Sequence, residues 1–307
     1  MDLKMKPCLY VVATPIGNLD DFTPRAQAIL QSVDLICAED TRHSSHLLSY
    51  FNIKTPLISL HEHNERERTD MLLSKLQEGK TLALISDAGT PLISDPGFIL
   101  VRTLKSHAIP VIPIPGACAA ITALSVCGLP TDRFIFEGFL SAKANARQQQ
   151  LLQLKDESRT LIFYESSHRI VQMLNDAKTI LGAERLGFIG REITKKFESY
   201  LNLNLNDLHE YYQQNQSQIR GEFVVIIEGV AKKDLKADKH ELDLNSLLSS
   251  LLKELPLKKV TQIVSELTGL KKNYVYEQAL IVQNNVIQHD IIQHNIPQDE
   301  SIKSIKE

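Results

Sequence analysis

The sequence predicts an α/β fold in which two α/β domains precede a small C-terminal helical segment. Residues 8–116 alternate short runs of Val, Ile and Leu with helix-length segments, which is typical of a mainly parallel sheet. The apolar runs are continuous rather than alternating, as in strands buried on both faces. A chain of 307 residues has room for two such domains. A charged stretch that begins at Lys232 separates them from the rest of the chain.

The first domain is expected to span residues 1–116. Its predicted strands are Leu9–Thr14, Leu35–Ala38, Leu57–Leu60, Thr81–Ser86 and Val111–Ile114. Its predicted helices are Thr23–Ser32, Ser44–Phe51, Arg66–Gln77 and Pro96–Ser106. Pro24 and Pro96 stand where proline commonly begins a helix. The N–H groups of the first turn have no partner within the helix, so proline loses no hydrogen bond there.

The second domain is expected to span residues 117–231 and opens with a helix of small residues, ACAAITALSVCGLP. Small side chains allow a helix either to pack closely on a sheet or to leave room for a ligand. The predicted strands are Phe134–Phe139, Thr160–Tyr164, Leu186–Ile189 and Glu222–Glu228. The predicted helices are Ala144–Lys155, His168–Leu181 and Asn206–Gln213. These strands are longer and rich in phenylalanine, which favours a mixed sheet.

Residues 232–307 are predicted to form a charged linker, a helical segment and a tail. Apolar residues at helical spacing, broken at Pro256 and Gly269, predict three short helices. These helices would form either a bundle or a helix-turn-helix. The last 20 or so residues, from Gln288, are expected to form a frayed tail.

The composition excludes several classes of protein. A net charge of −3 gives no basic surface over the whole chain, although a local basic face is compatible with it. No apolar run approaches the roughly 18–20 residues that span a bilayer. The first apolar run is interpreted as a buried strand rather than a signal peptide, because Pro15 and Gly17 end it early. Four cysteines without a C-x-x-C pair indicate free thiols in a reducing cytosol, so we expect a cytoplasmic protein.

The segment ALISDAGTPLISDPG, residues 83–97, is the strongest candidate for a ligand site. A buried strand that ends in a turn of small residues exposes backbone groups that can hold a small ligand. Asp87 and Asp95 add two carboxylates, which suit a cationic or amino-bearing ligand. The alternative is a plain strand–turn–helix connection in which Ser94 or Asp95 caps the next helix.

Two further strand ends in the first domain carry polar residues. The first strand ends in TPIGNLDD, but neither a G-x-G-x-x-G nor a phosphate-binding G-x-x-x-x-G-K-[ST] motif occurs. Glu39, Asp40 and Arg42 follow the second strand. His61, Glu62 and His63 follow the third, without the H-E-x-x-H spacing of a zinc helix. A polar or RNA-facing loop therefore explains them better than a metal, and no metal site is predicted.

The second domain carries a basic segment. No G-x-S-x-G motif supports a hydrolase nucleophile. Glu165, His168 and Arg169 follow one strand, where the functional residues of such sheets are usually found. A helix cap by Ser166 or Ser167 is the alternative interpretation. Arg191, Lys195 and Lys196 follow another strand and suit phosphate binding. A solvated helix face is the alternative interpretation.

Taken together, these segments resemble the small-subunit ribosomal RNA methyltransferase I family, which has the tetrapyrrole-methylase-like class III fold. The motifs LYVVATPIGNLDDFT, AEDTR, SLHEHNE, ALISDAGTPLISDPG, PIPGA, GLPTDRFIFEGFL, TLIFYESSHRI, RE-x-TK and GEFVVIIEG occur in the family's order. The resemblance covers about residues 8–230. Residues 200–205 depart from it, because they lack the glycine expected before the next helix.

The resemblance implies two α/β domains with S-adenosylmethionine in the cleft between them. It implies methyl transfer to the ribose 2′-hydroxyl of a cytidine in the decoding region of 16S rRNA, within the small ribosomal subunit. It also implies a cytoplasmic homodimer. The residues that it places at the cofactor are Pro15, Gly17, Asp87, Gly89, Thr90, Ile93, Ala117, Cys118, Tyr164 and Gly221.

The acceptor side is predicted from the chemistry of the reaction. A ribose hydroxyl needs a base or a charge that stabilises the developing oxyanion, and Lys195 and Glu192 are the first candidates. Glu165 and Asp95 stand behind them. RNA contacts are expected from two groups of residues, Arg42, His61, His63 and Asn64 in the first domain and Arg133, Lys143, Arg147 and Arg169 in the second. A tetrapyrrole methyltransferase and a non-catalytic ribosome assembly factor are the alternatives.

Overall fold

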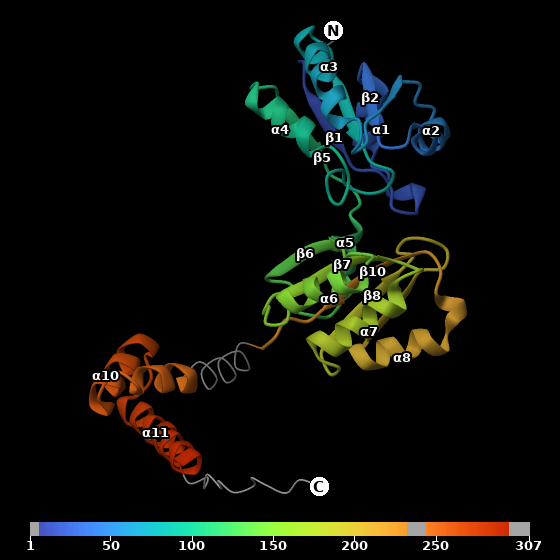
Figure 1. Cartoon of the computed structure of the whole chain (residues 1–307). Coiled ribbons are helices and arrows are strands. Elements are labelled where there is room, and N and C mark those ends of the chain that lie inside the picture. Colours follow the sequence, from blue (N-terminus) through green and yellow to red (C-terminus); the bar gives the residue numbers. More distant parts are fainter. Residues whose placement is uncertain (1–5, 232–243, 295–307) are drawn as a thin grey trace, which may run out of the picture. The chain divides into compact units, whose positions relative to one another are not determined.

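The first sheet is entirely parallel, with the strand order β3-β2-β4-β1-β5 (Figure 1). The structure is a computed structural model that describes residues 6–231 and 244–294. In the last helix it describes the side chains only as far as residue 283. The strands are β1 (Leu9–Val12), β2 (Leu35–Ala38), β3 (Leu57–Ser59), β4 (Leu82–Ile85) and β5 (Val111–Ile114). The five predicted strands of the first domain are confirmed, most of them one or two residues shorter than expected.

Helices cover both faces of the first sheet, as continuous apolar strands require. They are α1 (Pro24–Ser32), α2 (Thr41–Tyr50), α3 (Glu65–Gln77) and α4 (Phe98–Ser106), with a short 3-10 turn, η1 (Leu19–Asp21). Along β1, Leu9 packs with α3 and α4, whereas Tyr10 packs with α1 and α2. Figure 1 shows these two pairs of helices on opposite sides of the strands. Successive strand residues point to opposite faces, so burial on both sides demands apolar residues throughout.

Two helix starts differ from the prediction. Helix α2 begins three residues early because the Asp40 carboxylate accepts hydrogen bonds from the N–H groups of Arg42 and His43. Helix α4 begins after Gly97, whose φ is 125°, and no side chain caps it. Pro96 therefore precedes this helix rather than opening it, and neither Ser94 nor Asp95 acts as its cap.

The second sheet is mixed, as predicted, with the order β6-β7-β10-β8-β9. Its strands are β6 (Phe134–Phe139), β7 (Thr160–Ser166), β8 (Leu186–Arg191), β9 (Ser199–Asn204) and β10 (Glu222–Ile227). Strands β6 and β7 pair in parallel, and the other pairs are antiparallel. The sequence did not predict β9, which stands where a turn was expected. It is an edge strand with one neighbour, and its alternating Leu201 and Leu203 pack on the core.

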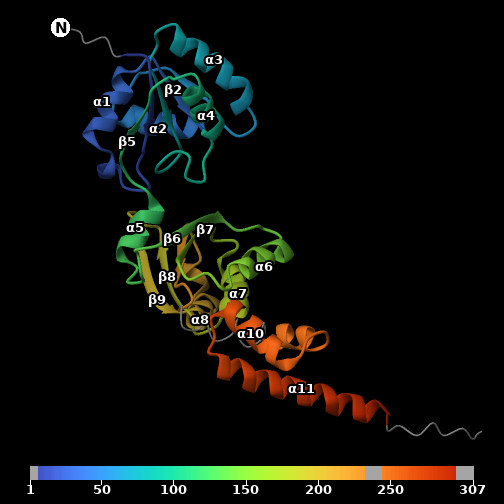
Figure 2. The same ribbon diagram turned by 90° about the vertical axis from the view of Figure 1, so that its left-hand side faces the viewer.

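Opposite faces of the second sheet carry different helices (Figure 2). Helices α6 (Ala144–Gln153), α7 (Ile170–Leu181) and α8 (Leu205–Gln214) cover one face around Phe163 and Val225. A 3-10 turn, η2 (Gln216–Gln218), follows α8. Helix α5 (Ala119–Val126) covers part of the other face. Ile16, from the loop after β1, packs in the α5 cluster, so this loop of the first sheet reaches the second sheet.

The C-terminal residues form a separate compact unit, which begins at Ala231. Residues 244–252 are helical and are followed by α10 (Leu257–Thr268) and α11 (Lys272–His294). Pro256 caps α10, and Gly269 ends it with a left-handed φ of 69°, as the breaks predicted. Helix α11 continues to His294, so the tail prediction is wrong for residues 288–294. Residues 295–307 and nearly all of the predicted linker lie outside the described residues.

Two other expectations concern the whole chain. All four cysteines are free, and Cys8, Cys37 and Cys127 are buried. Over residues 6–231 and 244–294, we find no helix with the length and apolar character needed to cross a membrane.

Candidate functional site

A cavity of about 450 Å³ is lined by loops and strand ends of both sheets. The first sheet contributes Glu39, which follows β2, and the turn Asp87–Asp95, which follows β4. The second sheet contributes the ends of β6 and β7, the turn after β8 and the start of β10. Small-molecule sites usually have volumes of about 300–1,000 Å³, so the cavity is large enough for a cofactor.

Two turns that line the cavity hold strained backbone. In the first turn Leu92 and Ser94 have φ angles of 72° and 69°. In the second, Glu192 and Thr194 have φ angles of 52° and 68°. A positive φ in a residue other than glycine is uncommon and persists only where the surroundings enforce it. The strain therefore marks both turns as candidates for function.

The loop after β1 is fastened to the first strained turn. Thr14 and Gly89 exchange two backbone hydrogen bonds of 2.9 and 3.1 Å. The Thr90 hydroxyl donates to the Ala117 carbonyl at 3.0 Å, which ties the same turn to the start of α5. Pro15 and Ala117 thus border the cavity through neighbours that line it.

Two glycines support the second strained turn by leaving space for it. A Cβ on Gly17 would collide with the Lys195 side chain, and a Cβ on Gly221 would collide with the Glu192 carboxylate. Gly221 also has a φ of 80°, which an L-residue rarely adopts. Neither glycine lines the cavity, but each allows a charged side chain to reach it.

Lys195 lies between two carboxylates at the cavity wall. Its Nζ is 2.9 Å from Glu192 Oε1 and 2.8 Å from Glu222 Oε2. Burial lowers the pKa of Lys195, but the bonds to Glu222 and Glu192 outweigh this and leave the pKa above its ordinary value. Burial raises the pKa of Glu192, but Lys195 and the Glu222 N–H outweigh this and leave it lowered. At neutral pH Lys195 is therefore an ammonium ion and Glu192 a carboxylate.

The carboxylates of Glu39, Asp87 and Asp95 also line the cavity, and none of them forms an ion pair within residues 6–231 and 244–294. Burial, followed by the charges of Asp95 and Asp87, raises the pKa of Glu39 to about 7. Burial and the charge of Asp87 raise the pKa of Asp95 to about 6, although the Ser86 hydroxyl opposes the shift. Mutually repelling carboxylates in a cavity are stabilised by a cationic ligand.

Tyr164 forms the aromatic end of the cavity. Burial raises the pKa of its phenol far above the ordinary value, so the hydroxyl stays neutral. Its oxygen accepts a hydrogen bond of 3.1 Å from the Ala120 N–H. The ring packs edge-on against Phe136 and Phe139, with centroids 4.9 and 5.7 Å away.

Most of the predicted cofactor and catalytic residues converge on this cavity. Those that line it are Asp87, Gly89, Thr90, Ile93, Cys118, Tyr164, Glu192 and Lys195. The reserve candidates Asp95 and Glu165 line it as well. Sequence reasoning missed Glu39, Phe139 and Glu222 as site residues. Glu39 had a usable signal, because it directly follows a parallel strand at the carboxyl edge of the sheet.

Four predicted RNA contacts in the first domain lie at the ends of β2 and β3. Arg42 is largely exposed, with its ion pair to Asp40 at 3.5 Å, and His63 is exposed too. His61 is half-buried, and its Nε2 lies 3.1 Å from the Asn64 amide nitrogen. Within the part of the chain that the structure describes, no three His, Cys, Asp or Glu side chains are grouped to hold a metal ion.

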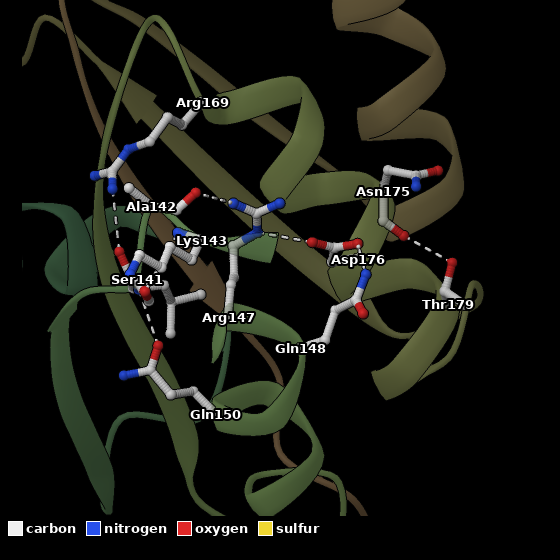
Figure 3. A network of polar contacts seen from close by, with 11 residues as sticks. Ser141, Ala142, Lys143, Arg147, Gln148, Gln150, Arg169, Asn175, Asp176 and Thr179 are labelled. Carbon is white, nitrogen blue, oxygen red and sulfur yellow. Dashed lines mark hydrogen bonds and ion pairs between the residues drawn. The ribbon is translucent and has the colours of Figure 1, made fainter. Parts of the chain in front are cut away.

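The structure corrects the prediction of Arg147 as an RNA contact (Figure 3). Its guanidinium is buried, and Nε donates to Asp176 Oδ2 at 2.7 Å. Gln148 donates to the other oxygen of the same carboxylate. A side chain that is 4% exposed cannot reach a phosphate, so Arg147 is a structural residue.

The other three predicted contacts in the second domain lie nearer the surface. Arg133 and Lys143 are exposed. Arg169 is 23% exposed and is held by Glu165 at 2.8 Å, and by the Leu140 carbonyl at 3.2 Å. These two contacts leave the Arg169 guanidinium little freedom to reach a nucleic acid.

Comparison with known proteins adds a family to this geometry. The family model of the Tetrapyrrole (Corrin/Porphyrin) Methylases matches residues 8–209, and that of the RsmI C-terminal HTH domain matches residues 238–282. Ribosomal RNA small subunit methyltransferase I of Pseudomonas aeruginosa is 51% identical over 276 residues, which are 89% of this chain and 96% of that protein. The Escherichia coli O157:H7 protein of the same name is 49% identical over 274 residues, which are 89% of this chain and 94% of that protein.

Solved structures of lower sequence identity share the fold. Uroporphyrin-III-C-methyltransferase from Thermus thermophilus aligns with a TM-score of 0.52 at 17% identity, over 73% of this chain and 94% of that chain. The methyltransferase CobJ aligns with a TM-score of 0.54 at 18% identity, over 73% of this chain and 95% of that chain. At such identities the alignments establish the α/β architecture alone.

Proposed function

Because this chain belongs to the ribosomal RNA small subunit methyltransferase I family, within the tetrapyrrole methylases, we propose that it methylates the ribose 2′-hydroxyl of a cytidine in the decoding region of 16S rRNA. The chain is an S-adenosylmethionine-dependent methyltransferase. The observation that carries the finer proposal is that the Lys195–Glu192 ion pair lines the same cavity as the carboxylates of Glu39, Asp87 and Asp95.

The cavity fits the methyl donor. When bound, S-adenosylmethionine supplies an electrophilic methyl group on a positively charged sulfur. Glu39, Asp87 and Asp95 supply negative charge that complements this sulfonium and the donor's ammonium group. Burial and the repulsion from Asp95 and Asp87 raise the pKa of Glu39, and such a cation would relieve the repulsion. The backbone of Gly89 and Thr90, fixed by the contacts to Thr14 and Ala117, would orient the donor.

The second wall suits a hydroxyl acceptor. Lys195 stays protonated, so it would stabilise the developing oxyanion rather than remove the proton. Glu192 Oε1 accepts hydrogen bonds from Lys195 and from the Glu222 N–H. The other oxygen, Oε2, has no hydrogen bond within the described residues and would accept the hydroxyl proton. Alignment of oxygen and methyl carbon at about 3 Å supplies much of the remaining acceleration.

The further parts of the proposal concern the whole molecule. We place the domain limits at residues 116 and 231, and the RNA contacts at Arg42, His61, His63, Asn64, Arg133 and Lys143. A substrate held by such contacts should bind with an affinity that falls steeply with salt. We also propose that the protein acts as a homodimer in the cytoplasm, on an assembled or nearly assembled small subunit.

The test is methyl transfer from labelled S-adenosylmethionine to intact small subunits, naked 16S rRNA and a tetrapyrrole precursor. We expect label on the subunit, at a ribose that resists alkaline cleavage because its 2′-oxygen is blocked. Label on the tetrapyrrole alone would refute the RNA acceptor. RNA binding without any transfer would instead indicate an assembly factor.

A further inference from the structure

Phe139 is a cavity residue to which no role in the reaction has yet been given. It is the last residue of β6, and 53% of its surface is exposed. Most large apolar side chains of the second sheet are buried in its two cores. Phe139 instead presents its ring to the cavity.

A β-bulge determines where this ring points. Phe136 pairs with Ile162, Gly138 pairs with Phe163 and Phe139 pairs with Tyr164, so one extra residue is accommodated in β6 between Phe136 and Gly138. Phe136 and Phe139 are three positions apart and would face opposite sides of a regular strand. The extra residue reverses this, and both rings contact Tyr164. Bulges of this kind redirect side chains beside active sites.

Two neighbouring groups hold the Phe139 ring in place, the Tyr164 ring and the strained turn of the first sheet. Tyr164, at an interplanar angle of 63°, is itself fixed by the Ala120 N–H. Gly138 has a φ of 65°, and a Cβ there would come within 2.9 Å of Ser94 Oγ. The strained turn of the first sheet therefore lies directly against the bulge, which places Ile93 on a segment next to Phe139. Ile93 is also exposed and also lines the cavity.

We propose that Phe139 is the stacking platform for the nucleobase of the acceptor nucleotide. A base that is turned out of its RNA loses stacking, and an exposed, fixed aromatic ring restores it. The adenine of the methyl donor has the same chemistry and is the competing source of the base. The carboxylates that fit the donor follow strands of the first sheet, whereas Phe139 and Lys195 both belong to the second. This division favours the acceptor, and the inference rests on the proposed RNA methylation.

The chain contains no tryptophan, so Phe139→Trp would introduce a single fluorescent reporter at the platform. Phe98→Trp is the matched control, because Phe98 is 63% exposed on α4 and is not among the residues that line the cavity. We expect small subunits to quench the Phe139→Trp emission, S-adenosylmethionine to leave it nearly unchanged, and neither to affect Phe98→Trp. Quenching by the donor alone would overturn the assignment.

Single-turnover methyl transfer gives the second readout. Phe139→Leu keeps apolar bulk without a ring and should weaken subunit binding about 5- to 150-fold, the range for loss of one stacked base. Its donor affinity by calorimetry should stay unchanged, and Phe139→Trp should restore subunit binding. Unchanged subunit binding by Phe139→Leu, while the wild type methylates normally, would overturn the inference but leave the RNA activity standing. Failure of the wild type to methylate RNA would instead refute the proposed function.

Discussion

The second domain holds two clusters in which basic and acidic side chains pair, and the two clusters differ in their access to solvent. Arg147 and Asp176 join α6 to α7, with side chains 4% and 9% exposed. Lys195, Glu192 and Glu222 lie at the end of β8 and the start of β10, with side chains 30%, 20% and 78% exposed. The cations of both clusters, Arg147 and Lys195, come from residues 143–196, where Lys and Arg outnumber Asp and Glu.

The contrast teaches that burial decides what a charge can do. A fully buried ion pair has its hydrogen bonds satisfied inside the protein. Its net contribution to stability is small, but removal of one partner leaves an uncompensated buried charge and is strongly destabilising. A pair at a cavity wall keeps one side free for a ligand. We therefore expect the Arg147 cluster to govern stability and the Lys195 cluster to govern methyl transfer.

The largest effect is expected from Arg147→Ala. Removal of the guanidinium leaves the Asp176 carboxylate buried without its cation, which should lower the free energy of unfolding by about 3–5 kcal/mol. Urea denaturation measures this change. The double variant Arg147→Met, Asp176→Leu should recover most of it, because no buried charge is left. A loss of RNA affinity at unchanged stability would break the comparison.

Lys195→Met should give the next largest effect. Loss of one group that stabilises an oxyanion typically costs about 100- to 1,000-fold in rate. Single-turnover transfer at saturating subunit and donor measures it, and the melting temperature should change little because the side chain is partly exposed. Lys196→Met, on the exposed neighbour in the same turn, is the control and should transfer at nearly the normal rate. A near-normal rate for Lys195→Met would refute its role.

Gly221→Ala tests whether the cluster depends on the space beside Glu192. The new Cβ would displace the Glu192 carboxylate, in addition to the strain of a left-handed φ that costs about 1–3 kcal/mol. Gly79→Ala has a similar φ, 93°, but meets open space. Both variants should lose stability in chemical denaturation, whereas only Gly221→Ala should lose methyl transfer. Equal activity of the two would show that the position of Glu192 is unimportant.

The smallest effect concerns the donor wall. Ionised Glu39 favours a cationic donor, so donor affinity should fall up to about fivefold from pH 7 to pH 6, as the group with a pKa of about 7 takes up its proton. Glu39→Gln should flatten this dependence in calorimetry, and Glu67→Gln on the exposed face of α3 should not. The folded-state pKa lies above the unfolded one, so Glu39 stabilises the fold less as pH rises through about 4.5 to 7. Glu39→Gln should therefore be the more stable protein at pH 8.

The sequence predicted the parallel sheet well because its signal is local. Strands such as Leu82–Ile85 are apolar throughout, and helices between them begin at clear caps such as Thr23. Strand β9 escaped prediction because Leu201 and Leu203 on one of its faces pack on the core, and the polar residues between them interrupt the apolar pattern. The early start of α2 was missed because Asp40 was not identified as its N-cap. In the structure the Asp40 carboxylate accepts hydrogen bonds from the N–H groups of Arg42 and His43.

The site was predictable where a residue follows a strand and unpredictable where it depends on pairing. Asp87 and Lys195 follow β4 and β8, and the ends of such strands are where sheets usually carry their ligands. Glu222 begins a strand, so nothing in its own neighbourhood distinguishes it. It reaches Lys195 because β10 lies antiparallel to β8, with Phe223 opposite Arg191.

By itself, the sequence determined the α/β class, the mixed second sheet and the two turns that line the cavity, because apolar periodicity and turn residues act over a few positions. Only the tertiary structure decided which charges are free. Arg147 and Lys195 carry the same charge and both belong to the second domain, yet Arg147 faces Asp176 in a core and Lys195 lines the cavity. The bulge that turns Phe139 to Tyr164 was also decided by the tertiary structure, because it is defined by the pairing of β6 with β7. Burial and strand register arise from contacts between distant segments, which no local pattern records.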